Sequence, residues 1–165
     1  MTAKAAFSPE EWKAVLEGPP SAGMIVVTAA RGGMLRETIA MSKAYAEARA
    51  QHGASELLDE IVSAKPEFDR HRYHSTRELH DAGLERLAEA AAVVGRKGTP
   101  QELNDYRKFV VTLASKVAAA HKEEGQQVSP AEQAALNEIR DRLEQASDGA
   151  PRHRDGTSGE DKLST

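Results

Sequence analysis

Between residues 103 and 121, apolar side chains recur every three or four positions, which is the spacing of one face of an α-helix. Thr99-Pro100-Gln101-Glu102 precedes this stretch with the residues of a helix start, and Gly125 follows it as a stop. A helix of this length spans about 30 Å, the width of a small domain. We predict that it is the central helix of a bundle, with a buried face formed by Leu103, Tyr106, Phe109, Val110, Leu113, Ala114, Val117, Ala118 and His121.

A second helix start lies near the N-terminus, in Phe7-Ser8-Pro9-Glu10-Glu11-Trp12. Ser8 is the predicted N-cap, the proline suits the first helical position, and Glu11 can complete a capping box. The two aromatic residues stand where a hydrophobic staple requires them. Gly18-Pro19-Pro20 follows, and this combination predicts that the helix ends there.

Residues 23–30 are the most ambiguous stretch of the chain. Ile25, Val26, Val27 and Thr28 are β-branched residues, which are typical of strands. A strand needs a partner, however, and the similar run at 109–112 lies inside the central helical pattern. We therefore interpret the segment as a buried helix, with a strand as the alternative.

Helical patterns also cover residues 34–51, 55–64, 75–94 and 129–146, and Gly95 is the predicted end of the third. For the first of these, the predicted inner face comprises Leu35, Thr38, Ile39, Ser42, Tyr45 and Ala46. From Ser147 onward the chain has almost no apolar residues. The prediction is an all-α protein: one bundle of about six or seven helices over residues 1–146 and a disordered tail over 147–165.

Composition narrows the possible functions. Apolar residues make up 39% of the 165 residues and aromatic residues only 4%, so the core must depend on aliphatic side chains and alanine. The chain has no cysteine, which excludes disulfides, thiolate catalysis and Cys-ligated zinc. A net charge of −4 disfavours general nucleic-acid binding. With no signal-peptide pattern and no apolar run of membrane-spanning length, we expect a cytoplasmic bacterial protein.

The stretch from Asp69 to His80 holds three of the six histidines. His71, His74, Glu78 and His80 are candidate metal ligands, because zinc, nickel and iron accept imidazole and carboxylate groups. Against this, His74 and His80 are six residues apart, which places them on different sides of a helix. No HExxH motif is present, and three nearby arginines would repel a cation.

The same stretch has two other interpretations. Arg70, Arg72 and Arg77, with Tyr73, could bind a phosphate and stack a base beside a helix start. Alternatively, the arginines pair with local carboxylates in a solvated loop, which is the interpretation we favour. Neither Arg31-Gly32-Gly33, which lacks phosphate-loop spacing, nor any serine suggests a catalytic set.

Three segments resemble a family of bacterial helical proteins of similar length that has no established activity. They are Phe7–Trp12, Gly23-Met24 and Val128–Leu136. This resemblance implies a helical fold and no functional residue. A fainter likeness connects Ala29-Ala30-Arg31-Gly32 to the TerB-like tellurite-resistance bundles, where an acidic residue stands in place of Arg31; we transfer no site from it.

The leading functional prediction is a non-catalytic cytoplasmic helical protein that acts by binding a protein partner or another copy of itself. We expect no cofactor, no membrane association and no nucleic-acid partner. The alternative is a metal-binding or stress-response protein that uses His71, His74, Glu78 and His80. An enzyme with a pocket lined by Tyr45, Tyr106 or His121 is the third possibility.

Overall fold

A computed structural model describes residues 2–29, 34–51, 55–64, 70–120 and 128–148. Over these residues the protein is all-α, as predicted, and contains no strand. Two short 3₁₀ helices, η1 (Lys4–Ala6) and η2 (Arg70–Arg72), accompany the α-helices. The α-helices are α1 (Pro9–Ala29), α2 (Met34–Ala50), α3 (Glu56–Ser63), α4 (Thr76–Lys97), α5 (Pro100–Ala119) and α6 (Pro130–Asp148).

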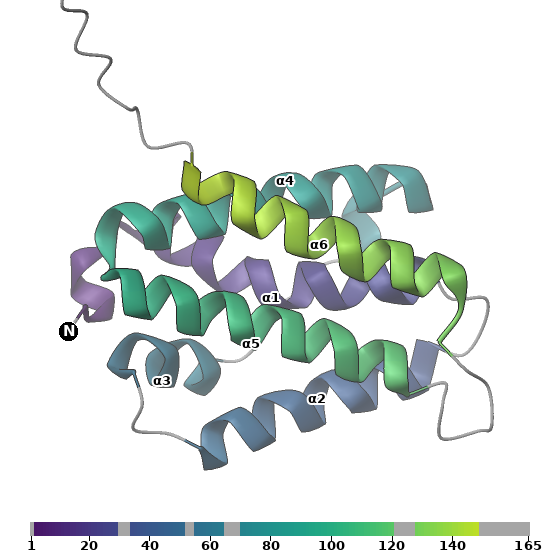
Figure 1. Ribbon diagram of the computed structural model, residues 1–165, viewed down its shortest axis with the longest axis horizontal. Helices are drawn as coiled ribbons and strands as arrows, with labels where there is room; N and C mark the ends of the chain where they lie inside the picture. Colours follow the sequence, from purple (N-terminus) through teal and green to yellow (C-terminus); the bar gives the residue numbers. More distant parts are fainter. Residues whose placement is uncertain (1, 30–33, 52–54, 65–69, 121–127, 149–165) are drawn as a thin grey trace, which may run out of the picture.

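Helix α1 is the centre of the bundle. It packs against α2, α4, α5 and α6, and thirteen of its 21 residues are buried, from Trp12 to Val27. In Figure 1, α5 crosses in front of the bundle between α6 and the pair formed by α2 and α3. The helix that we expected at the centre, α5, therefore has one face on the core and one face toward solvent.

The predicted helix starts are confirmed. Ser8, Thr99 and Ser129 each accept a hydrogen bond from the backbone three residues later, and the glutamate at that position accepts one from the cap residue's own backbone. Ser75 and Ser55 cap α4 and α3 through their hydroxyls. Because these capping hydrogen bonds join residues three positions apart, the local sequence is enough to specify them.

Glu102, in the cap of α5, also holds the N-terminal segment. Its two carboxylate oxygens accept hydrogen bonds of 2.8 and 2.7 Å from the Thr2 backbone and hydroxyl. Burial of the side chain raises the pKa of Glu102, but the hydrogen bonds from Thr99 and Thr2 outweigh burial and lower the pKa to about 2. The folded state therefore favours the ionised carboxylate.

The predicted helix end at Gly18-Pro19-Pro20 is wrong, because α1 continues through both prolines. Pro19 has no N–H to donate to the Val15 carbonyl, and a proline ring crowds the carbonyl four residues before it. The Tyr106 hydroxyl of α5 donates a hydrogen bond of 2.8 Å to the same oxygen. Gly18 leaves space for this contact, since a Cβ there would lie 2.1 Å from the hydroxyl oxygen.

The other boundaries are close to those expected. Residues 23–29 are helical, which confirms the buried-helix interpretation over the strand. Helix α4 runs past Gly95 to Lys97, and α6 ends at Asp148, two residues into the predicted tail. Arg31-Gly32-Gly33, His121, Gly125 and residues 149–165 lie outside the described residues.

The predicted inner face of α2 is wrong for four of its six residues. Thr38, Ile39, Ser42 and Ala46 are exposed, whereas the buried line on this helix is Glu37, Ala44 and Tyr45, with Met41 and Ala48 partly buried. The Tyr45 ring meets the Phe109 ring edge-on at 5.3 Å between centroids. Compared with the expected orientation, α2 is turned about its own axis by about one residue position. The side chain of the sixth predicted residue, Leu35, is not among those that the structure describes.

Candidate functional site

The four predicted metal ligands lie in η2, in the segment after it and in the first turns of α4. Among the residues described, no group of three histidine or carboxylate side chains could hold a metal ion. His71 lies in η2 and His74 is exposed. The Glu78 carboxylate accepts a hydrogen bond of 2.9 Å from the His74 backbone N–H, a helix-start contact.

His80 instead joins two helices. Its Nε2 lies 2.9 Å from a carboxylate oxygen of Glu138 on α6, and its Nδ1 lies 3.1 Å from Asp81. The two carboxylates flank opposite sides of one imidazole ring. The contact with Glu138 joins α4 to α6, so His80 takes part in the packing of these two helices.

The two tyrosines considered as pocket residues lie in the packed core. Tyr106 is 1% exposed and Tyr45 is 2% exposed. Burial raises the pKa of both phenols above the ordinary value; neighbouring Tyr45 adds to the shift of Tyr106, and Arg49 opposes that of Tyr45. Both hydroxyls are therefore protonated at neutral pH and do not act as bases.

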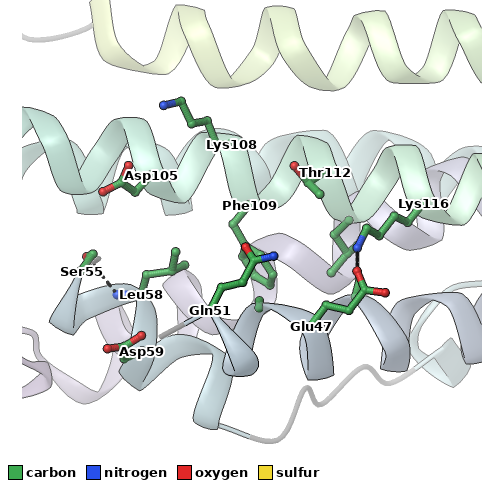
Figure 2. Close-up of a pocket in the computed structure, with 13 residues that line it drawn as sticks. Glu47, Gln51, Ser55, Leu58, Asp59, Asp105, Lys108, Phe109, Thr112 and Lys116 are labelled. Carbon is green, nitrogen blue, oxygen red and sulfur yellow. Dashed lines mark hydrogen bonds and ion pairs between the residues drawn. The ribbon is translucent and has the colours of Figure 1, made fainter. Parts of the chain in front are cut away.

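A hollow of about 250 Å³ lies where α2, α3 and α5 meet (Figure 2). Its apolar lining comes from Ala44 and Ala48 of α2, Leu58 of α3, and Phe109 and Leu113 of α5. Polar and charged side chains form the rest of the lining: Glu47, Gln51, Ser55, Asp59, Asp105, Lys108, Thr112 and Lys116.

A second hollow, of about 560 Å³, continues along α2 and α5 toward the end of α5. Glu47 and Lys116 line both hollows and form an ion pair between the two helices. We call the two hollows together the α2–α5 groove. The second hollow is lined by Arg36, Ile39, Ala40, Lys43, Glu47, Lys116, Ala119 and Ala120.

Ile39 gives the α2–α5 groove its most unusual feature. Its exposed fraction is 59%, and it is the one large hydrophobic side chain recorded as exposed among the described residues. A single exposed isoleucine needs no explanation by itself. Here, however, Ile39 lines a hollow together with Ala40, Ala119 and Ala120, so the exposed isoleucine belongs to a partly apolar recess.

The chemistry of the groove suits binding. The Glu47 carboxylate is engaged by Lys116, Asp105 accepts a hydrogen bond from Gln101, and the Ser55 hydroxyl caps α3. A groove with both apolar and charged lining residues can bind an amphipathic segment, and the charged residues determine the orientation of that segment.

None of the candidate site residues named from the sequence lines the α2–α5 groove. One sequence signal was present: Lys108, Thr112 and Lys116 recur every four residues along the polar edge of α5. That signal alone shows only a solvated edge. The site depends on the orientation of α2, which exposes Ile39 in the same hollow as Lys116.

No protein-family model matches this chain, and no curated protein or solved structure matches it significantly. The two resemblances noted in the sequence therefore stay predictions. The fold and the candidate site are described from this chain's own sequence and structure alone. None of the described helices combines the length and the apolar character needed to cross a membrane.

Proposed function

We propose that the protein acts without catalysis, by binding a protein segment in the α2–α5 groove in the bacterial cytoplasm. One observation supports this proposal most strongly. Ile39 of α2 is exposed in a hollow that alanines also line, although Glu37 of the same helix is buried. A partner that covers this surface would remove its apolar area from water, and each Å² removed stabilises the complex by about 25 cal/mol.

The dimensions of the groove support a protein segment as the occupant. The lining residues of α5 and its C-cap extend from Asp105 to Ala120, a distance of about 22 Å at about 1.5 Å per residue. An elongated, partly apolar surface of this length fits several turns of a helix. The occupant is a different protein or a second copy of this chain.

Photo-crosslinking in the native cells tests the proposal. A photoreactive amino acid is placed at Ile39 and, as the matched control, at Glu85, which is exposed in the middle of α4. The proposal expects a discrete protein adduct from position 39 and none from position 85. The mass of the adduct identifies either another protein or a covalent dimer.

Two results would overturn the proposal. One is the absence of any adduct from position 39, although the labelled protein is folded and abundant. The other is the same set of adducts from both positions, since that pattern reports random collisions rather than a binding surface.

A further inference from the structure

A further hollow, of about 360 Å³, lies between α5 and α6, which run side by side in Figure 1. Its volume falls within the range of about 300–1,000 Å³ that sites for small molecules occupy. Three cations line it, Arg107 and Lys108 of α5 and Arg140 of α6, together with one carboxylate, Glu144. The lining is therefore positively charged, although the chain as a whole has a net charge of −4.

Two of these cations have defined directions. The Nε of Arg107 donates a hydrogen bond of 3.2 Å to the Leu143 backbone carbonyl on α6, and the Arg107 side chain is half-buried. This bond fixes the guanidinium group and uses one of its five N–H donors. Figure 2 shows Lys108 leaving α5 on the side away from α2 and α3, toward α6.

The positive charges of this hollow are not neutralised inside it. Arg140 and Glu144 are four residues apart on α6, a spacing that permits an ion pair. Within the described part of the chain, however, Glu144 pairs with none of the three cations, and neither Lys108 nor Arg140 has a carboxylate partner elsewhere. Like charges in one recess repel each other, so an anion bound between them would be stabilised by all three.

The donors around the hollow suit a phosphoryl group better than a carboxylate. A phosphate monoester carries close to two negative charges above neutral pH and has three strong acceptor oxygens. Arginine offers paired N–H groups that match phosphate geometry, and lysine adds a compact charge. The Asn104 amide and the Thr112 hydroxyl, which also line the hollow, supply neutral donors.

We propose that the hollow between α5 and α6 binds a small molecule that carries a phosphoryl group, with Arg107, Lys108 and Arg140 around that group. This phosphoryl site is distinct from the α2–α5 groove, whose lining shares only Lys108 and Thr112 with it. The inference therefore does not depend on the proposed function.

An NMR titration of the isotope-labelled full-length protein tests the inference, with phenyl phosphate as the probe and about 0.15 M salt present. Benzoate is the matched control ligand, because it has the same ring but a single negative charge. We expect phenyl phosphate to shift the backbone amide signals of α5 and α6 around the hollow. We also expect it to bind about tenfold more tightly than benzoate, because it carries more charge and more acceptor oxygens.

Two protein variants distinguish the site from the general surface charge. Arg140→Gln and Arg142→Gln each remove one positive charge from α6, but Arg142 does not line the hollow. The dissociation constant for phenyl phosphate should rise about tenfold in Arg140→Gln, which loses a charge-assisted hydrogen bond. It should rise less than about twofold in Arg142→Gln, because salt screens charges that do not contact the ligand. Circular dichroism checks that both variants are folded.

Three results would overturn the inference: no binding of phenyl phosphate to the wild-type protein, equal affinity for benzoate, or equal weakening in the two variants. The last would mean that the probe responds to overall charge rather than to this hollow. None of these results bears on the crosslink at position 39, so the two proposals fail separately.

Discussion

Replacing Tyr106 by phenylalanine removes one oxygen atom from the core and tests how α1 passes through its two prolines. The Tyr106 hydroxyl donates to the Val15 carbonyl, which the missing N–H of Pro19 leaves without its helical partner. A buried carbonyl without a hydrogen bond costs about 1–3 kcal/mol. We therefore expect Tyr106→Phe to lower the free energy of unfolding by about 2 kcal/mol.

Tyr45→Phe is the matched control. Tyr45 is as buried as Tyr106, but its hydroxyl has no hydrogen-bond partner among the described residues. Removing a buried hydroxyl that makes no hydrogen bond abolishes a desolvation cost, so we expect a change of at most about 0.5 kcal/mol, or a gain in stability. Urea denaturation followed by circular dichroism measures both variants under the same conditions.

A double-mutant cycle with Pro19→Ala makes the test specific. Alanine restores an N–H at position 19 that can donate to the Val15 carbonyl. In that background the cost of Tyr106→Phe should fall to less than half. An equal cost in both backgrounds, or equal costs for the two tyrosine variants in the wild-type protein, would refute the reasoning.

Three further predictions concern glycines, pH and metal. Gly18→Ala should destabilise the protein by about 1–3 kcal/mol, because its Cβ meets the Tyr106 hydroxyl, whereas the helical and exposed Gly95→Ala should stabilise it by about 0.5–1 kcal/mol in the same denaturation assay. The Glu102 pKa lies below its ordinary value, so its contribution is present above about pH 4.5 and disappears as pH falls toward 2. Wild type should lose about 2–3 kcal/mol more than Glu102→Gln between pH 5 and pH 2, and parallel stability profiles would contradict this. Elemental analysis of tag-free protein tests the alternative metal function: a stoichiometric metal that is lost on His74→Ala would support it, and a metal-free protein would end it.

Features that depend on neighbouring residues could be predicted from the sequence. The three Ser/Thr-Pro-x-Glu starts and the buried stripe of α5 follow from local hydrogen bonds and helical spacing. The helix end at Gly18-Pro19-Pro20 was predicted wrongly for the opposite reason. Its compensating donor, Tyr106, is 91 residues away from Val15, and no local pattern contains that information.

The orientation of α2 shows the same limit. Its sequence offers two faces, one through Thr38, Ile39 and Ser42 and one through Met41 and Ala48, with Tyr45 near both. Tertiary contacts decide between them: Gly23 leaves room for Met41, since a Cβ there would lie 2.4 Å from the Met41 methyl group. The α2–α5 groove depends on this orientation of α2, because the face that turns away from the core is the one that carries Ile39.

The most direct test of the central claim is hydrogen–deuterium exchange of the protein, alone and bound to the partner that position 39 captures. The account predicts slower exchange in α2 and in α5 from Asp105 to Ala119, with α4 unchanged around Glu85. Protection confined to α4 and α6, with α2 exchanging as in the free protein, would contradict it.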